Sequence, residues 1–203
     1  ALGASTIAML DMLRGHVGFL GYVLVEISRA LVNPKQLRFG ELLTQLSRVC
    51  VSAVPVVALV TCLIGLVFAY LLGLQAEQYG ANIFVVDGVA LGMTREFSPM
   101  IVAVIVAGRS GAAFAAQLGT MRLNEETDAI AILGLSVAQV LVVTRVLALV
   151  LTMPLLVFVG NVAGLAGAAA IADLMLDVTP STFVSRLHDA LAPRHVLIGL
   201  AKA

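Results

Sequence analysis

The sequence has little charge for its length. Lysine, arginine, aspartate and glutamate make up 12% of its 203 residues, whereas a soluble domain carries about 25%. Hydrophobic residues make up 61%, more than an aqueous core of this size can bury. The formal net charge is zero and no basic tract is present to neutralise phosphates, which excludes nucleic acid as a partner. The low charge and the apolar excess indicate an integral membrane protein.

The sequence also lacks a catalytic or metal-binding constellation. Its histidines, His16, His188 and His195, are scattered along the chain. Its cysteines, Cys50 and Cys62, lie about 18 Å apart along one apolar helix, so they cannot form a disulfide within it. We therefore expect no catalytic residue, no metal and no cofactor in this chain.

A nucleotide-binding P-loop is missing as well, because that motif needs lysine between glycine and serine or threonine. The lysines here are Lys35, which follows proline, and Lys202, which follows alanine. ATP-driven work would therefore have to be done by another subunit.

Three apolar runs exceed the length of about 20 residues that a transmembrane helix needs. They cover 49–74, 97–121 and 146–172, and the second carries one charge, Arg109. Another apolar helix begins at Val196 and reaches 196–203, which is too short to cross a bilayer, so we expect the remaining spans to lie beyond this sequence. These runs predict an all-α integral membrane protein with a single domain over residues 1–203.

The first 32 residues carry a weak polar stripe on an otherwise apolar helix. This pattern is typical of a helix in the membrane interface, although a helix packed on the rest of the protein also fits. Asn33 and Pro34 should end the helix, because proline disfavours helix in the residue before it. Residues 75–94 are mixed in character, and we expect a turn followed by a short helix there.

The positions of lysine and arginine predict the orientation in the membrane. They precede the first span, are absent between that span and residue 95, and return near the loop after the second span. We therefore predict that the N-terminus and the 122–138 loop face the cytoplasm.

Small residues recur four positions apart in the second and third spans, a spacing that lets helix backbones approach closely. Either intramolecular packing or the seam of a homodimer would use this spacing. The second span carries Gly108, Ala112 and Ala116 on one line and Gly111, Ala115 and Gly119 on the next; the third carries Gly160, Gly164, Ala163 and Gly167.

Three charges stand at membrane depth, where charge is costly. Arg95 and Glu96 precede Pro99 at the outer end of the second span. They fit either a pair at the level of the lipid headgroups or the polar rim of a substrate cavity, and they need not pair with each other. Arg109 could either snorkel toward the cytoplasm or bond to backbone carbonyls of a neighbouring helix, and we favour a structural role.

Residues 122–135 contain a short amphipathic helix that faces the cytoplasm in the predicted orientation. Asn124 is a good N-cap, and acidic residues follow it at the positive end of the helix dipole. Such a helix fits either docking into a soluble partner or packing on the protein's own surface. Its polar and apolar members are Asn124, Glu125, Glu126, Asp128, Ile130 and Leu133.

Four motifs between residues 95 and 129 give the chain a family resemblance. They are REFSP at 95–99, AGRSGAA at 107–113, LGTM at 118–121 and EETDA at 125–129. In order and spacing they resemble the MlaE/YrbE permease family. The chain departs from the family pattern at Gln117, where a glutamate is usual, and it stops where the family continues into further spans.

The resemblance implies a permease subunit of an ABC transporter that moves phospholipids or related hydrophobic molecules between the inner and outer membranes. It implies a homodimer in the bacterial inner membrane, a cytoplasmic ATPase that binds the ATP, a periplasmic MCE-domain protein and in some cases a STAS-domain subunit. Residues 122–135 would then be the coupling helix that meets the ATPase. Arg95, Glu96 and, by a weaker correspondence, Lys202 would border the lipid pocket.

A lipid site also needs apolar walls for its tails, which Leu71, Leu74 and Met93 could supply, while Arg95 could contact the phosphate. Two other classes stay open. An ion-coupled secondary transporter prefers ionisable residues in mid-span and paired repeats, and only Arg109 is in mid-span here. A membrane assembly subunit without transport activity is the other alternative.

Overall fold

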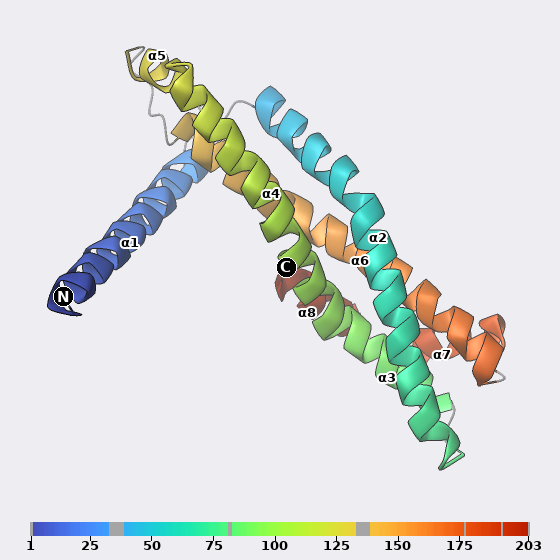
Figure 1. Cartoon of the computed structure of the whole chain (residues 1–203). Helices are drawn as coiled ribbons and strands as arrows, with labels where there is room; N and C mark the ends of the chain where they lie inside the picture. Colours follow the sequence, from blue (N-terminus) through green and yellow to red (C-terminus); the bar gives the residue numbers. More distant parts are fainter. Residues whose placement is uncertain are drawn as a thin grey trace. The chain divides into compact units, whose positions relative to one another are not determined.

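The protein is helical wherever the structure describes it. The structure, a computed structural model, describes residues 2–32, 39–80, 83–132, 139–176, 178–191 and 193–202, and no strand occurs among them (Figure 1). Three helical stretches are long and apolar enough to cross a membrane: Gly40–Glu77, Phe84–Leu123 and Leu141–Met175. Each contains one predicted span, so the chain is an all-α integral membrane protein, as the composition predicted.

The helices are longer than the apolar runs that predicted them. Charged and polar residues at the helix ends extend each helix beyond the hydrophobic stretch of the span. The helices are α1 (Leu2–Val32), α2 (Phe39–Glu77), α3 (Ile83–Gly92), α4 (Ser98–Leu123), α5 (Glu126–Ile132), α6 (Thr144–Met175), α7 (Pro180–Ala190) and α8 (Pro193–Lys202), with π-helical turns η2 (Met93–Phe97) and η3 (Gln139–Val143).

The chain divides into two compact units. The first comprises Ala1–Gln45 and Phe114–Leu149, and the second comprises Leu46–Ala113 and Val150–Ala203. The first unit holds α1, which contacts η3, together with α5. The second unit holds α3, α7 and α8, with α7 against α3 and α8 against η2. Each of the long helices α2, α4 and α6 has one part in the first unit and the other part in the second.

In the second unit, α2 and α6 approach each other so closely that only glycine fits at the crossing. A Cβ added at Gly65 would collide with the backbone carbonyl of Gly164, and one added at Gly167 would collide with the carbonyl of Cys62. The core beside this crossing includes Ala69, Val86 and Ala168. The glycines of the third span therefore pack within the chain, as one of the two sequence interpretations expected.

The short helix α5 begins later than predicted. Its first hydrogen bonds run to the carbonyl of Glu125, from the amides of Asp128 and Ala129. The residue before the helix is therefore Glu125, which has a positive φ of 57°, and Asn124 is not the N-cap. The Asn124 side chain instead donates to Glu126 Oε1 at 3.4 Å.

Candidate functional site

A π-helical turn interrupts the second span at the point where the charged pair stands. The amide of Ser98 donates to the carbonyl of Met93, one residue further back than in an α-helix. Pro99 cannot donate to the carbonyl of Arg95, because proline lacks an N–H. Met93 and Thr94 are buried, whereas Arg95 and Glu96 are exposed. The turn thus separates a core-facing pair from a charged pair on the surface of the second unit.

Helix α8 brings a second cation to this pair. A Cβ at Gly199 would collide with the carbonyl of Thr94, so the absence of a side chain lets α8 lie directly on η2. One turn later, Lys202 Nζ donates to Glu96 Oε1 at 2.7 Å and to the freed carbonyl of Arg95 at 3.4 Å. Arg95 Nε lies 3.6 Å from the same Glu96 oxygen. Three residues predicted from the sequence therefore form one cluster, with two cations sharing one carboxylate.

An apolar cavity of about 350 Å³ lies between α2 and the last residue of η2. Phe97, next to Glu96 in sequence, forms one wall and packs against Phe68 of α2 with ring centroids 4.8 Å apart. Leu71 belongs to the lining, as predicted. The remaining lining residues come from α2: Leu63, Ile64 and Val67. The charged cluster and the apolar cavity therefore share the π-helical turn η2, although no charged side chain lines the cavity.

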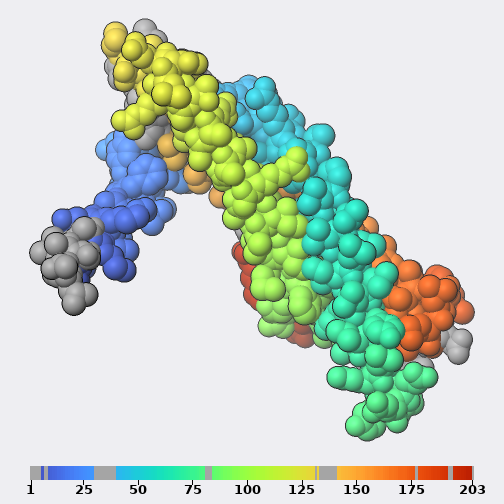
Figure 2. Space-filling view, viewed as in Figure 1, coloured from blue at the N-terminus to red at the C-terminus, as the bar shows by residue number. Residues whose placement is uncertain are grey.

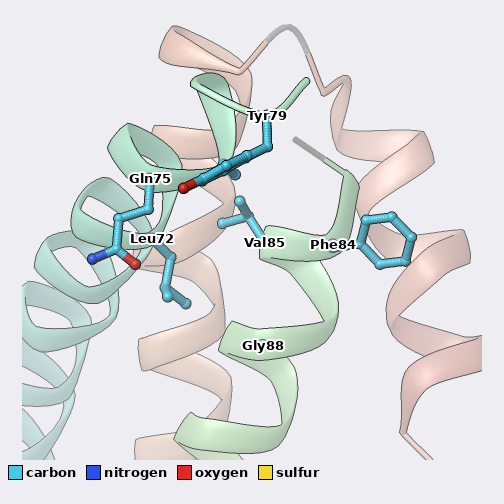
Figure 3. A pocket seen from close by; sticks show the side chains of 7 residues that line it. Leu72, Gln75, Tyr79, Phe84, Val85 and Gly88 are labelled. Atoms are coloured by element: carbon cyan, nitrogen blue, oxygen red, sulfur yellow. The ribbon is translucent and has the colours of Figure 1, made fainter. Parts of the chain in front are cut away.

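A second cavity, of about 280 Å³, lies between the end of α2 and the start of α3. Figure 3 shows Leu72, Gln75 and Tyr79 on the α2 side and Val85 and Gly88 on α3. Tyr79 is 84% exposed, and its hydroxyl and the Gln75 amide are the polar side-chain groups of the lining. The cavity is mainly apolar, with polar groups at its mouth.

Helix α7 is attached to α3 beside this second cavity. Arg186 donates from Nε and Nη2 to the two carboxylate oxygens of Asp87, at 3.0 and 2.8 Å. The guanidinium also lies 5.9 Å from the ring centroid of Phe84, and Phe183 is buried in the core. The hydrogen bonds that Arg186 donates to Asp87 raise the pKa of Arg186 above its ordinary value, because they favour the charged guanidinium.

Two of the predicted apolar residues do not line the first cavity. Met93 is 0% exposed and its side chain packs in the core, so the prediction that it contacts lipid is wrong. Leu74 is exposed but lies outside the lining of both cavities.

The Arg109 side chain bonds to a neighbouring helix. Its Nη1 donates to the backbone carbonyl of Ser52 in α2, the second of the two arrangements that the sequence allowed. By contrast, nothing lies within 4 Å of a Cβ built at Gly108, Gly111 or Gly119. These glycines and Ala115 are exposed, and Figure 2 shows α4 uncovered on the face in view. The small residues of α4 thus have no packing partner among the described parts of their units.

The candidate coupling residues lie in and around α5. Asn124, Glu125, Glu126 and Asp128 are exposed and Ile130 is partly buried, while Leu133 lies outside the described residues. The hydrophobic residues that the sequence analysis passed over are the most exposed ones here: Leu123 at 86% and Ile132 at 85%. They bracket the acidic residues, so this surface is both acidic and apolar.

Sequence reasoning missed three further features. The Asp87–Arg186 pair joins residues far apart in the sequence, so no local pattern indicates it. Phe97 stands within the REFSP motif but was not singled out. Arg145 was considered only as one of the positive residues that predict the membrane orientation, although it is just 6% exposed. No group of metal-binding side chains occurs in the described ranges.

Three helices able to cross a membrane, a charged cluster and an apolar cavity that share η2, and an exposed acidic helix between two spans define a polytopic membrane protein of the transporter type. The sequence profile described as Permease MlaE matches residues 42–203. The chain therefore belongs to the MlaE permease family.

Individual relatives agree with this assignment. A probable ABC transporter permease protein of Rickettsia bellii is 35% identical over 174 residues, which cover 86% of this chain and 67% of the relative. One of Rickettsia prowazekii is 33% identical, covering 88% and 68%. The chloroplastic protein TRIGALACTOSYLDIACYLGLYCEROL 1 of Arabidopsis thaliana is 32% identical, covering 79% of this chain and 46% of the plant protein.

Proposed function

We propose that this chain is the permease subunit of an ABC transporter that moves phospholipids or related hydrophobic molecules between the inner and outer membranes of a bacterium. The two Rickettsia relatives are named as probable ABC transporter permeases. The plant relative bears the name of a glycerolipid, which supports a lipid cargo. A cytoplasmic ATPase would bind and hydrolyse the ATP.

The observation that carries the proposal is that η2 contributes both to the charged cluster and, through Phe97, to the wall of the apolar cavity. Arg95 and Lys202 together bring two positive charges against one negative charge on Glu96. The cluster can therefore accept a further anion, and a lipid phosphate can receive charge-assisted hydrogen bonds from Arg95. The cavity lined by Leu71 and Phe97 would hold part of an acyl chain.

The proposed partners follow from the exposed surfaces and from the family. The small-residue face of α4 suits a second copy of this chain, because close backbone approach stabilises helix pairs in membranes. The acidic and apolar surface around α5 suits the ATPase. A periplasmic MCE-domain protein and a STAS-domain subunit complete the proposed complex in the bacterial inner membrane.

The ion-coupled alternative receives little support from the described residues. Arg109, the charge in mid-span, is bonded to a backbone carbonyl, and guanidinium groups keep their proton at physiological pH. A proton-coupled mechanism would need a titratable group at this depth.

The proposal is tested first on the full-length protein purified in mild detergent. We expect an ATPase and an MCE-domain protein to co-purify, together with bound phospholipid identified by mass spectrometry. A protein that purifies alone, without an ATPase, would contradict the proposal and shift weight to the ion-coupled class.

Site variants test the lipid contact separately. In the complete complex reconstituted in vesicles, Arg95→Gln and Glu96→Gln should lower lipid transfer while the ATPase stays bound. Arg194→Gln, an exposed arginine outside the cluster, is the matched control and should transfer lipid normally. Undiminished transfer in both site variants would refute the assignment of this cluster. Loss of transfer with the complex still assembled would also count against an assembly subunit without transport activity.

A further inference from the structure

The backbone of η2 presents two successive carbonyls that lack their α-helical donors. The amide of Ser98, which would bond to the Thr94 carbonyl in a regular α-helix, donates to the Met93 carbonyl instead. Pro99 has no N–H to donate to the carbonyl of Arg95, nor to that of Thr94. The π-helical turn and the proline that follows it therefore open both carbonyls to another part of the chain.

Helix α8 lies on both of these carbonyls. A Cβ at Gly199 would collide with the Thr94 carbonyl, and it would stand 3.7 Å from the Cα of Arg95. Three residues later, Lys202 Nζ lies 3.4 Å from the Arg95 carbonyl oxygen and 2.7 Å from Glu96 Oε1. The position of the ammonium group thus depends on the close approach of the α8 backbone to η2.

The position of this ammonium group decides what Arg95 can bind. Lys202 Nζ donates to Glu96 Oε1, whereas Arg95 Nε lies 3.6 Å from the same oxygen, beyond hydrogen-bond distance. If Lys202 moved away, the Glu96 carboxylate could close on the neighbouring guanidinium, because such pairs form strong charge-assisted hydrogen bonds. Lys202 therefore occupies the carboxylate and leaves the Arg95 guanidinium for an anion.

We propose that Pro99 and Gly199 are positioning residues that hold Lys202 in the lipid site. Pro99 keeps the two carbonyls open, and Gly199 lets α8 lie against them. This inference rests on the proposed function, in which Arg95 receives the lipid phosphate. Neither positioning residue contacts the cargo, and each acts through Lys202. The proline of the REFSP motif thereby gains a role that its sequence neighbours alone do not indicate.

The reactivity of Lys202 toward an amine-acylating reagent reports where its ammonium group lies. Lys35 and Lys202 are the two lysines of the sequence, so Lys35 provides the reference in the same sample once the peptides are resolved by mass spectrometry. In the purified complex, Gly199→Ala and Pro99→Ala should each raise the labelling of Lys202 about two- to fivefold. The change is modest because partly exposed ion pairs are weak.

Two matched variants serve as controls for the labelling. Ala201→Leu adds a side chain at an exposed position of α8, and Pro154→Ala removes the proline inside α6. Both should leave Lys202 at its wild-type reactivity. A rise of the same size in either control would mean that the labelling follows general loosening of the chain, and it would overturn the assignment.

Thermal unfolding separates positioning from a purely structural role. Proline inside a helix costs stability, so Pro99→Ala should unfold at or above the wild-type midpoint while Lys202 becomes more reactive. A lower midpoint with unchanged reactivity of Lys202 is the result that a purely structural proline predicts, and it would overturn the inference for Pro99.

Lipid transfer in reconstituted vesicles tests whether the two residues act through Lys202. Gly199→Ala, Pro99→Ala and Lys202→Met should each lower transfer while the ATPase stays bound. Adding Lys202→Met to either positioning variant should cause no further loss, because both changes remove the same contact.

The outcomes distinguish this inference from the proposed function. Wild-type reactivity of Lys202 in both positioning variants, or normal transfer despite raised reactivity, overturns the inference while the proposed function stands. A wild-type complex without an ATPase overturns the proposed function and the lipid role of the two residues with it, whereas the labelling of Lys202 does not depend on the cargo.

Discussion

Helices α4 and α6 carry small residues at the same spacing, but only one of them is covered. In α6, the side-chain positions of Gly164 and Gly167 are filled by groups from other parts of the second unit, including the Thr61 and Cys62 carbonyls of α2. In α4, Gly108 and Gly111 meet nothing within 4 Å. The spacing therefore predicts the capacity for close approach, while the partner depends on what the rest of the chain brings near.

The same kind of substitution should therefore have different effects on α6 and on α4. A side chain added on α6 has to displace backbone atoms of α2, which cannot yield as a flexible side chain can. A side chain added at Gly108 or Gly111 of α4 enters space that no described residue fills, so it should disturb a partner outside the chain. Substitutions on the two helices should thus separate the folding of one chain from its association.

The largest effect is expected for Gly167→Val. The new side chain would collide with the carbonyl of Cys62, and overpacking costs about 1–3 kcal/mol, more where the backbone has to move. Thermal unfolding in detergent, followed by circular dichroism, should show a large drop in the midpoint. Ala166→Val, at an exposed neighbouring position, is the control. Equal midpoints for the two variants would show that the α2–α6 crossing is looser than described.

A smaller and different effect is expected for Gly111→Leu. The chain should unfold at the wild-type temperature, because the position is open. The proposed homodimer should weaken by more than about tenfold, equivalent to about 1.4 kcal/mol, as measured by energy transfer between labelled chains diluted in vesicles. Val104→Leu, at a position exposed on the same helix, should leave association unchanged. Wild-type association of Gly111→Leu would place the partner on another face.

The contrast between α4 and α6 also shows how much of the structure can be predicted from the sequence. Length and composition predict the spans, because crossing a bilayer needs a run of apolar residues, and proline at Pro34 predicts the end of α1. The motif at 95–99 predicts two members of the charged cluster. The third member, Lys202, was expected only from a weaker family correspondence. Its contact with Glu96 depends on the close approach that Gly199 permits between α8 and η2, which no local pattern indicates.

Other features escape prediction because they depend on irregular backbone. Met93 was named as an apolar wall from its residue type alone, whereas its side chain at the start of the π-helical turn is fully buried in the core. The start of α5 shifts because Glu125 adopts a positive φ, whereas capping preference alone favours Asn124. The buried state of Arg145 follows from residues of α4 that lie far from it in sequence.

Arg109→Met tests what holds the open helix α4 in place. The variant loses the bond from Arg109 Nη1 to the Ser52 carbonyl, and a net loss of about 1 kcal/mol is expected for one hydrogen bond. The midpoint of thermal unfolding should fall by less than in Gly167→Val. The unfolding midpoint of Arg109→Lys, which keeps a donor, should lie between those of the wild type and Arg109→Met. If Arg109→Met is as damaging as Gly167→Val, α4 is held by this bond more than by packing.

The smallest effect is expected where charge, and not close packing, joins two helices. Asp87→Asn removes the carboxylate that accepts both bonds from Arg186, and partly exposed ion pairs contribute little to stability. Because the pKa of Arg186 is raised in the folded protein, its contribution is full at neutral pH and is lost only as the pH rises through that raised value. The difference in unfolding midpoint between wild type and Asp87→Asn should therefore stay constant between neutral and mildly alkaline pH, and should shrink in high salt. The exchanged pair, Asp87→Arg with Arg186→Asp, should recover part of the loss. A loss as large as that of Gly167→Val would mean that the attachment of α7 to α3 depends on this pair more than on the burial of Phe183.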